Sequence, residues 1–297
     1  MKHRTRLLRR IAATVVVAAG AFSMASCGSS EPRSLLSDIE NGSVVLGTKF
    51  DQPGLGERTP EKDFAGMDVD VSRYVVTYIA DKNGWDVPEI EWRETPSSQR
   101  ETLINNGEVN MIAATYSVNA GRLAAVDFAG PYTVTHQGLL IEAATGITGL
   151  EDVKDGMRLC SVSGSTPAQK VKEALPGVQL QEFDTYAACA EGVKQGVVDA
   201  LTTDATILAG FAQRYKERYN DDFRVIQLQN PDGSFWTDEH YGIGLPKGDG
   251  TDREAVNEAL EEMYDSGAFD EIVKDNLGAD FEVGPKPDIG DLSFADN

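Results

Sequence analysis

The sequence contains two successive series in which short apolar runs alternate with stretches of helical periodicity. Val71, Val75 and Ile79, for example, fall on one face of a helix. In the first series we expect strands at 43–48, 89–92 and 109–114, and helices around 71–79 and 98–105. Such alternation produces a parallel-rich sheet with helices on both faces. The first half of the chain is therefore expected to form an α/β lobe.

The second series repeats this alternation. We expect its strands at 157–162, 178–183, 197–202 and 223–228, and its helices at 168–174, 186–195 and 204–213, followed by two amphipathic helices at 253–264 and 268–276. Extended stretches at 138–143 and 241–245 fit two crossings between the lobes. Ligands of open α/β sheets sit beyond the carboxyl ends of the strands. The sequence therefore predicts an α/β protein of two lobes with a hinge and an interlobe cleft.

The N-terminal segment has the features of an export signal. Residues 1–10 are basic, residues 11–22 are apolar but short for a membrane span, and small residues precede Cys27. A cysteine at this place resembles the lipobox of bacterial lipoproteins, which predicts a signal peptide at 1–26, acylation of Cys27 and a tether at 27–42. An ordinary secretory signal is the alternative, and Arg9-Arg10 leaves a twin-arginine route open.

The charge of the chain excludes one class of partner. Removal of residues 1–26 would leave 22 basic against 48 acidic residues, a net charge of about −26. Phosphate binding requires a basic surface, so nucleic acid is not expected as a partner. A negatively charged ligand would have to enter a local cationic pocket against the negative electrostatic field of the whole protein.

Two cysteines remain after the signal, Cys160 and Cys189. In an oxidising compartment a disulfide is the simplest interpretation. No histidine lies between them or close beside them, so we expect no metal site. The sequence shows neither a nucleophile–base motif nor a phosphate loop, and we expect no cofactor and no enzyme activity.

The stretch TYSVNAGRLAAVDFAGPY places Arg122 shortly after Thr115 and Ser117. A guanidinium offers a rigid fork of donors that fits a carboxylate, and hydroxyl groups can complete such a site. The alternative is a solvated surface arginine beside a helix cap.

The motifs GMDVDV, TYSVNAGR, VDFAGPY, SGST and GVVDALTTD, in this order and spacing, resemble those of the amino-acid-binding ABC-transporter solute-binding proteins. Within that family the chain is most similar to actinobacterial glutamate-binding lipoproteins. The resemblance covers residues 43–276 and implies the periplasmic-binding-protein fold. We expect lobe 1 at 43–137 and 241–280, lobe 2 at 138–240, and a loosely held polar tail at 281–297.

The resemblance also implies ligand contacts for the α-amino-acid group. Arg122 and Ser117 would hold the α-carboxylate, Thr115 would accept from the α-ammonium, and Asp204 would pair with it. Thr166 would approach from the other lobe. Asp204 and Thr166 could instead serve only as helix-capping residues.

Side-chain selectivity depends on a second set of residues. Arg100 occupies the position that reads the distal carboxylate in acidic-amino-acid binders of the family, and Ser97 occupies another contact position. Lys49 or Gln52 could add a polar group, and Phe50 or Tyr186 an aromatic wall. A neutral glutamine would leave buried cations without a countercharge. Glutamate or aspartate is therefore expected; glutamine or another polar amino acid is the alternative, and Arg100 could also be a solvated helix residue.

The partners follow from the same resemblance. We expect a monomer that is lipid-anchored at the outer face of the cell membrane and delivers its ligand to the permease of an ABC importer. A cyclohexadienyl-type dehydratase on this fold and an amino-acid sensor domain are the rival functions.

Overall fold

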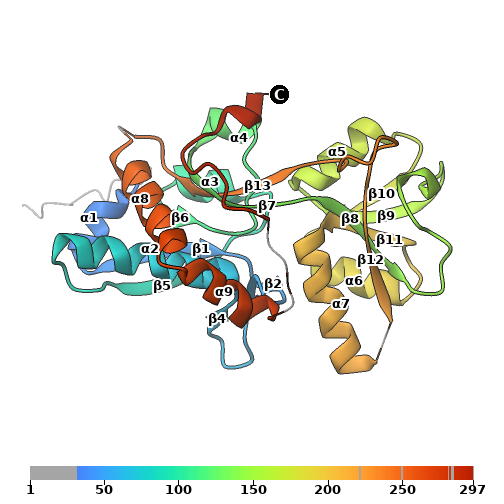
Figure 1. Cartoon of the computed structure of the whole chain (residues 1–297), viewed down its shortest axis with the longest axis horizontal. Coiled ribbons are helices and arrows are strands. Elements are labelled where there is room, and N and C mark those ends of the chain that lie inside the picture. Colours follow the sequence, from blue (N-terminus) through green and yellow to red (C-terminus); the bar gives the residue numbers. More distant parts are fainter. Residues whose placement is uncertain (1–31, 221, 249, 280, 282–283, 297) are drawn as a thin grey trace, which may run out of the picture.

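The computed structural model describes residues 32–220, 222–248, 250–279, 281 and 284–296. The predicted signal peptide at 1–26 and Cys27 lie outside these residues. Two α/β lobes stand side by side and are connected by the long strands β7 and β13 (Figure 1). Lobe 1 comprises the elements from α1 to β7 and from β13 to α9, and lobe 2 those from β8 to β12. The mixed α/β fold class agrees with the sequence pattern.

Lobe 1 is built on a five-stranded sheet in the order β5-β1-β6-β13-β7. The strand β1 pairs in parallel with β5 and β6, and β13 pairs antiparallel with β6 and β7. The strands are β1 (Ser43–Thr48), β5 (Glu89–Glu94), β6 (Met111–Ile112), β7 (Asp127–Thr135) and β13 (Glu239–Leu245). The helices are α1 (Leu35–Glu40), α2 (Met67–Asn83), α3 (Arg100–Asn105), α4 (Ala120–Ala125), α8 (Thr251–Asp265) and α9 (Ala268–Leu277).

The turn after β1 is more ordered than the sequence pattern indicates. It forms a small antiparallel sheet in the order β2-β3-β4, made of β2 (Asp51–Gln52), β3 (Gly56–Arg58) and β4 (Phe64–Ala65). This sheet leads directly into α2. Because β2 lies at the carboxyl end of β1, the small sheet fixes the position of the turn that follows β1.

Lobe 2 has a second five-stranded sheet in the order β10-β9-β11-β8-β12. Its strands are β8 (Gln137–Glu142), β9 (Arg158–Val162), β10 (Gln179–Phe183), β11 (Ala200–Asp204) and β12 (Phe223–Gln227), with a short 3-10 helix η1 (Leu150–Asp152). Its helices are α5 (Thr166–Ala174), α6 (Tyr186–Lys194) and α7 (Ala205–Tyr219). A disulfide joins Cys160 on β9 to Cys189 on α6 in the buried core, as expected.

The chain passes between the two sheets twice. One residue, His136, separates β7 in the first sheet from β8 in the second. The return runs through residues 228–238 into β13, which begins at Glu239. Two adjacent crossings of this kind form a hinge about which the lobes can close.

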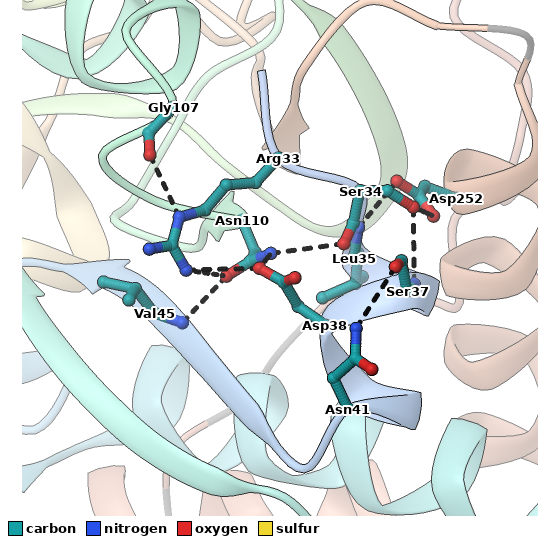
Figure 2. A network of polar contacts seen from close by, with 10 residues as sticks. All are labelled: Arg33, Ser34, Leu35, Ser37, Asp38, Asn41, Val45, Gly107, Asn110 and Asp252. Carbon is teal, nitrogen blue, oxygen red and sulfur yellow. Dashed lines mark hydrogen bonds and ion pairs between the residues drawn. The ribbon is translucent and has the colours of Figure 1, made fainter. Parts of the chain in front are cut away.

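Part of the predicted tether belongs to the folded lobe. Arg33 donates to the Gly107 carbonyl (3.0 Å) and pairs with Asp38 (3.2 Å), which also accepts from Asn110 (2.8 Å) (Figure 2). Asp252 accepts from the first backbone N–H groups of α1, which satisfies donors that a helix start leaves unpaired. The expectation of a tether up to residue 42 is therefore wrong, because α1 packs against lobe 1.

The C-terminal segment is also packed. Phe294 stacks on His240 with 3.8 Å between ring centroids, and Lys286 forms ion pairs with Glu261 and Asp265 on α8. A second short 3-10 helix, η2 (Ser293–Asp296), completes the segment. The expectation of a loosely held tail is wrong for its described residues, since a few apolar side chains in a polar sequence are enough to attach it to lobe 1.

Candidate functional site

The turn after β1 provides two buried polar side chains. The Lys49 ammonium donates to Ser97 Oγ (2.6 Å), and Gln52 Nε2 donates to Thr115 Oγ1 (3.1 Å). Burial, and then the nearby charge of Arg100, lower the pKa of Lys49 to about 7. No carboxylate forms an ion pair with Lys49 among the residues described. An anion that comes close to such a buried ammonium stabilises its charged form.

Arg100 opens α3 and is buried, with only 2% of its surface exposed. One terminal nitrogen donates to the Ala114 carbonyl (3.0 Å), the guanidinium lies 4.0 Å from the centre of the Tyr116 ring, and Nε has no hydrogen-bond partner. Burial and the charge of Arg122 lower the pKa of Arg100 to about 10. The alternative of a solvated helix arginine is wrong, and the free Nε–H leaves donor capacity for a ligand.

Thr115 follows β6 in a backbone conformation that is unusual for its residue type. Its φ of 45° lies in the left-handed region, where a β-branched residue is strained at a typical cost of about 1–3 kcal/mol. Asp68 on α2 accepts from the Thr115 N–H (2.7 Å) and from the Tyr132 hydroxyl (2.6 Å). Strain of this kind persists only where surrounding contacts determine the conformation, and Asp68 provides one of them.

Arg122 lies on α4, and its guanidinium reaches both lobes. In lobe 1 it donates to the Ser117 carbonyl (2.5 Å) and lies 3.4 Å from a Glu101 carboxylate oxygen. In lobe 2 it donates to Thr166 Oγ1 (3.0 Å) and to the Gly164 carbonyl (2.9 Å). The side chain is largely buried, so the alternative of a solvated surface arginine is wrong. Its donors form a fork at the junction of the lobes.

Asp204 ends β11 in lobe 2 and is buried. Its Oδ2 accepts from the Tyr241 hydroxyl (2.6 Å), whereas its Oδ1 has no hydrogen-bond partner. Asp204 stands at the N-cap position of α7 but makes no side-chain capping bond, so the capping alternative is wrong. Burial, and then the charge of Glu239, raise the pKa of Asp204 well above its ordinary value. A ligand cation would relieve this desolvated carboxylate.

Two hydroxyl groups complete the lobe 2 side. Thr166 begins α5, but the capping side chain there is that of Ser165, which accepts from the Ala168 N–H (3.2 Å). The Tyr186 ring, buried at the start of α6, lies 6.0 Å from Lys49 Nζ. Burial and the charge of Asp204 raise the pKa of Tyr186, which therefore stays a neutral hydroxyl at physiological pH.

All ten predicted ligand residues thus gather where the two lobes meet, and most of them are buried. They are Lys49, Gln52, Ser97, Arg100, Thr115, Ser117, Arg122, Thr166, Tyr186 and Asp204. Sequence reasoning did not assign Asp68, Tyr116, Glu239 or Tyr241 to this cluster. For Asp68 and Tyr116 a signal was present in the motifs GMDVDV and TYSVNAGR, whereas Glu239 and Tyr241 lie in a run that indicates only a strand.

The buried charges are separated into two ends. Apart from burial, the largest influence on the pKa of Lys49 is the charge of Arg100, and the largest influence on that of Asp204 is the charge of Glu239. The charge of Arg122 acts on the groups at both ends. We call Lys49 and Arg100 the cationic end of the cluster, and Asp204 and Glu239 its anionic end; the charge of Arg100, like that of Arg122, also reaches Asp204.

Direct contacts between the lobes close the site. Asp51 accepts from the Ala187 N–H at the start of α6 (3.0 Å), and Glu57 pairs with Arg214 on α7 (2.6 Å). A Cβ atom on Gly210 would lie 2.2 Å from the Pro53 carbonyl oxygen, so only glycine allows the backbones to approach this closely. The structure shows the lobes in a closed arrangement.

Two further findings concern the described residues only. Within them, no group of three or more His, Cys, Asp or Glu side chains could hold a metal ion. In the same part of the chain, no helix is both long and apolar enough to span a bilayer.

Comparisons with known proteins agree with the motif pattern. The sequence profile of the bacterial extracellular solute-binding proteins, family 3, matches residues 44–279. The chain is 54% identical to the glutamate-binding protein GluB of Corynebacterium efficiens, over the full length of both. It is 30% identical to the ABC transporter glutamine-binding protein GlnH of Bacillus subtilis, covering 84% of this chain and 90% of the other.

The fold has counterparts among solved structures. The solute receptor for L-cysteine of Neisseria gonorrhoeae superposes with a TM-score of 0.73 at 22% identity, covering 85% of this chain and all of the other. At this identity the likeness concerns the fold alone.

Proposed function

Because the chain belongs to the bacterial extracellular solute-binding proteins, family 3, we propose that it captures an acidic amino acid, glutamate or aspartate, between its closing lobes. Membership makes it an extracellular protein that binds a solute and serves an importer rather than an enzyme. The choice of an acidic ligand rests on the buried charges. In particular, Lys49 and Arg100 are buried cations without an ion-pair partner among the described residues.

The α-carboxylate of the ligand is held by Arg122. This guanidinium is already oriented by the Ser117 carbonyl and by Glu101. A guanidinium binds a carboxylate in two parallel hydrogen bonds, so the ligand takes over donors that in this structure reach Thr166 and Gly164. Thr166 and Gly164 contact the same guanidinium from lobe 2, so capture of the α-carboxylate and closure of the lobes depend on one side chain.

The α-ammonium of the ligand pairs with Asp204. The unpaired Oδ1 offers an acceptor, and Tyr241 orients the carboxylate through Oδ2. Thr115 adds an acceptor from lobe 1. A buried carboxylate gains most from a cation that also satisfies its free lone pairs.

The distal carboxylate of the ligand binds at the cationic end. Arg100 offers its unpaired Nε–H, and Lys49 offers an ammonium close to Ser97 and the Tyr186 ring. A glutamine amide would leave the buried Arg100 cation without a countercharge, which costs several kcal/mol in the interior of a protein. Lys49, whose pKa is about 7, would then lose its proton. The name of the 54% identical relative supports the same choice, and the glutamine-binding relative is more distant.

The partners follow from the family. The closed, liganded protein docks on the permease of an ABC importer, and acylation of Cys27 keeps it at the outer face of the cell membrane as a monomer. Acyl chains provide such attachment without a spanning helix.

Calorimetry with glutamate, aspartate, glutamine and asparagine tests the proposal. We expect the two acidic ligands to bind most tightly. Arg100→Met, which removes the charge but keeps apolar volume, should weaken glutamate binding about 30-fold, since a charged hydrogen bond contributes about 2 kcal/mol. Arg93→Ala is a matched control, because Arg93 lies in the same lobe and pairs with Glu108 at the surface. The proposal is wrong if glutamine binds best or if both variants bind glutamate as the wild type does.

A further inference from the structure

Asp68 is a fully buried carboxylate that has no part in the proposed ligand contacts. It is the second residue of α2, and the start of this helix is fixed by Gly66. A Cβ atom on Gly66 would lie 2.3 Å from the Leu55 carbonyl oxygen, and the residue has a φ of 124°. The motif GMDVDV thus brings the first turn of α2 against the small sheet and directs Asp68 toward the site.

Both oxygens of Asp68 accept hydrogen bonds from neutral donors. Oδ2 accepts from the Thr115 N–H (2.7 Å), and Oδ1 accepts from the Tyr132 hydroxyl (2.6 Å). No arginine or lysine forms an ion pair with Asp68 in the part of the chain that the structure describes. Burial raises the pKa of Asp68 to about 6, although both hydrogen bonds oppose this shift. A buried carboxylate usually stabilises a fold less than an apolar residue of similar size would. Its presence at this place therefore indicates that its two hydrogen bonds have a role.

The bond to Thr115 connects Asp68 to the selectivity residues. The Ala114–Thr115 segment receives a bond from Arg100 at the Ala114 carbonyl (3.0 Å) and one from Gln52 at the Thr115 hydroxyl (3.1 Å). The same hydroxyl lies 2.7 Å from the Ala114 carbonyl oxygen. Arg100 and Gln52 are therefore attached to a strained segment whose N–H is held by Asp68.

We propose that Asp68 is a positioning residue of the binding site, which fixes the Thr115 backbone and through it Arg100 and Gln52, and so sets the preference for an acidic side chain. This inference rests on the proposed function. It makes a distinct claim, because Asp68 touches no ligand in the proposed mode. The preference of glutamate over glutamine should therefore depend on a residue outside the contact set.

The substitution Asp68→Leu tests the inference. A leucine has a similar shape but no acceptor oxygen, so the bonds from the Thr115 N–H and from the Tyr132 hydroxyl are both lost. We expect glutamate affinity to fall at least tenfold and the ratio of glutamate to glutamine affinity to fall at least threefold. Tyr132→Phe removes only the second bond and should leave the ratio within twofold. Asp70→Asn, which affects an acid of the same helix turn that accepts from Asn276, should change neither quantity.

Amide hydrogen exchange of the wild-type protein gives a second readout that needs no variant to fold. In the ligand-free protein the Thr115 N–H should exchange at least 100-fold more slowly than exposed loop amides of lobe 1, because a buried carboxylate already holds it. If Thr115 becomes protected only when glutamate binds, Asp68 does not preorganise the segment and the inference fails.

The two proposals fail in different ways. If the wild-type protein binds glutamine more tightly than glutamate, the proposed function is wrong whatever Asp68 does. If the wild type prefers glutamate and Asp68→Leu keeps the wild-type ratio, the proposed function stands and the role of Asp68 is overturned. A ratio that changes equally in Tyr132→Phe also overturns it, since general loosening of the core would then explain the effect.

Discussion

Lobe 1 and lobe 2 contribute different chemistry to one site. Lobe 1 contributes three buried cations, Lys49, Arg100 and Arg122, which hydrogen bonds hold in place. It also contributes the buried carboxylates Asp68 and Glu239. Lobe 2 contributes one carboxylate, Asp204, together with hydroxyl groups on helices that begin at the interface. In the binding mode proposed above, lobe 1 therefore binds the two carboxylates of the ligand. Lobe 2 binds the ammonium through Asp204, with Thr115 of lobe 1 as a second acceptor, and completes the enclosure.

Removal of the single lobe 2 carboxylate should have the largest effect. Asp204→Asn keeps the acceptor for Tyr241 but removes the charge, so glutamate affinity should fall about 30-fold, as for other hydrogen bonds to charged groups. The ligand-free protein should become more stable at pH 7, because burial disfavours this carboxylate. Calorimetry and urea unfolding give the two quantities.

The control for Asp204 is an exposed carboxylate of the same lobe, Asp184. Asp184→Asn should leave both affinity and stability near the wild-type values. If Asp204→Asn binds glutamate as tightly as the wild type, another residue binds the ammonium, and the division of roles between the lobes is incorrect.

The lobe 1 cations should make binding dependent on pH. Lys49 has a pKa of about 7 in the free protein, and a bound carboxylate favours its charged form, so binding takes up a proton above pH 7. Glutamate affinity should fall between pH 7 and 8.5, by up to about tenfold per pH unit for one proton. Asp204 and Glu239 have the opposite effect on glutamate affinity. Because their pKa values are raised, they become neutral as the pH falls, and binding of the ligand ammonium should weaken.

Lys49→Met separates these contributions. The variant should bind glutamate more weakly at pH 7 and should lose the decline of affinity at higher pH. The same substitution removes an ammonium that burial disfavours, so ligand-free stability should no longer rise with pH between about 7 and 10.5, where the unfolded chain binds the extra proton. An unchanged pH profile of affinity would show that Lys49 does not contact the distal acid.

The smallest effect is expected from the contact between the lobes outside the site. Glu57 and Arg214 pair across the interface while remaining partly exposed, and such pairs contribute about 0.2–1 kcal/mol. Because this pair joins the two lobes, it stabilises the closed arrangement, and Arg214→Ala should weaken glutamate binding about two- to fivefold.

Arg158→Ala is the matched control for Arg214. Arg158 pairs with Asp199 at similar exposure but within lobe 2. It should lower stability without changing affinity. Equal effects of both variants on affinity would mean that the interlobe pair has no specific part in closure.

The sequence predicts much of this architecture, and the failures have physical causes. The spacing of Val71, Val75 and Ile79 predicts α2, because these residues form the apolar face that the helix buries against the core. The strand β7 is not predicted, since Gly130 and Pro131 interrupt its pattern. The packed tail is missed because its attachment depends on a few long-range contacts, such as that of Phe294 with His240.

The candidate site likewise contains residues that the sequence predicts and residues that it does not. Polar residues just after the expected strands, such as Lys49 and Thr115, are predictable, because the carboxyl ends of strands in an α/β sheet face the cleft. The burial of Asp68 and Glu239 is not predicted by the local pattern, since an acidic residue in a helix or strand is usually exposed, although the motif GMDVDV marks Asp68. Their burial depends on tertiary partners that the local pattern does not contain.

The anchoring of the N-terminal segment through Arg33 has a consequence for the orientation of the protein at the bilayer. In a chain acylated at Cys27, five residues separate the lipid-bearing cysteine from Arg33, and an extended leash of that length reaches only about 20 Å. Because Arg33, Asp38 and Asn110 bind the leash to lobe 1, the same flank of lobe 1 would always stay near the lipid headgroups. Lobe 2 would then be the lobe that moves relative to the bilayer when the two lobes open and close. The protein would meet the transporter only within a thin layer above the membrane.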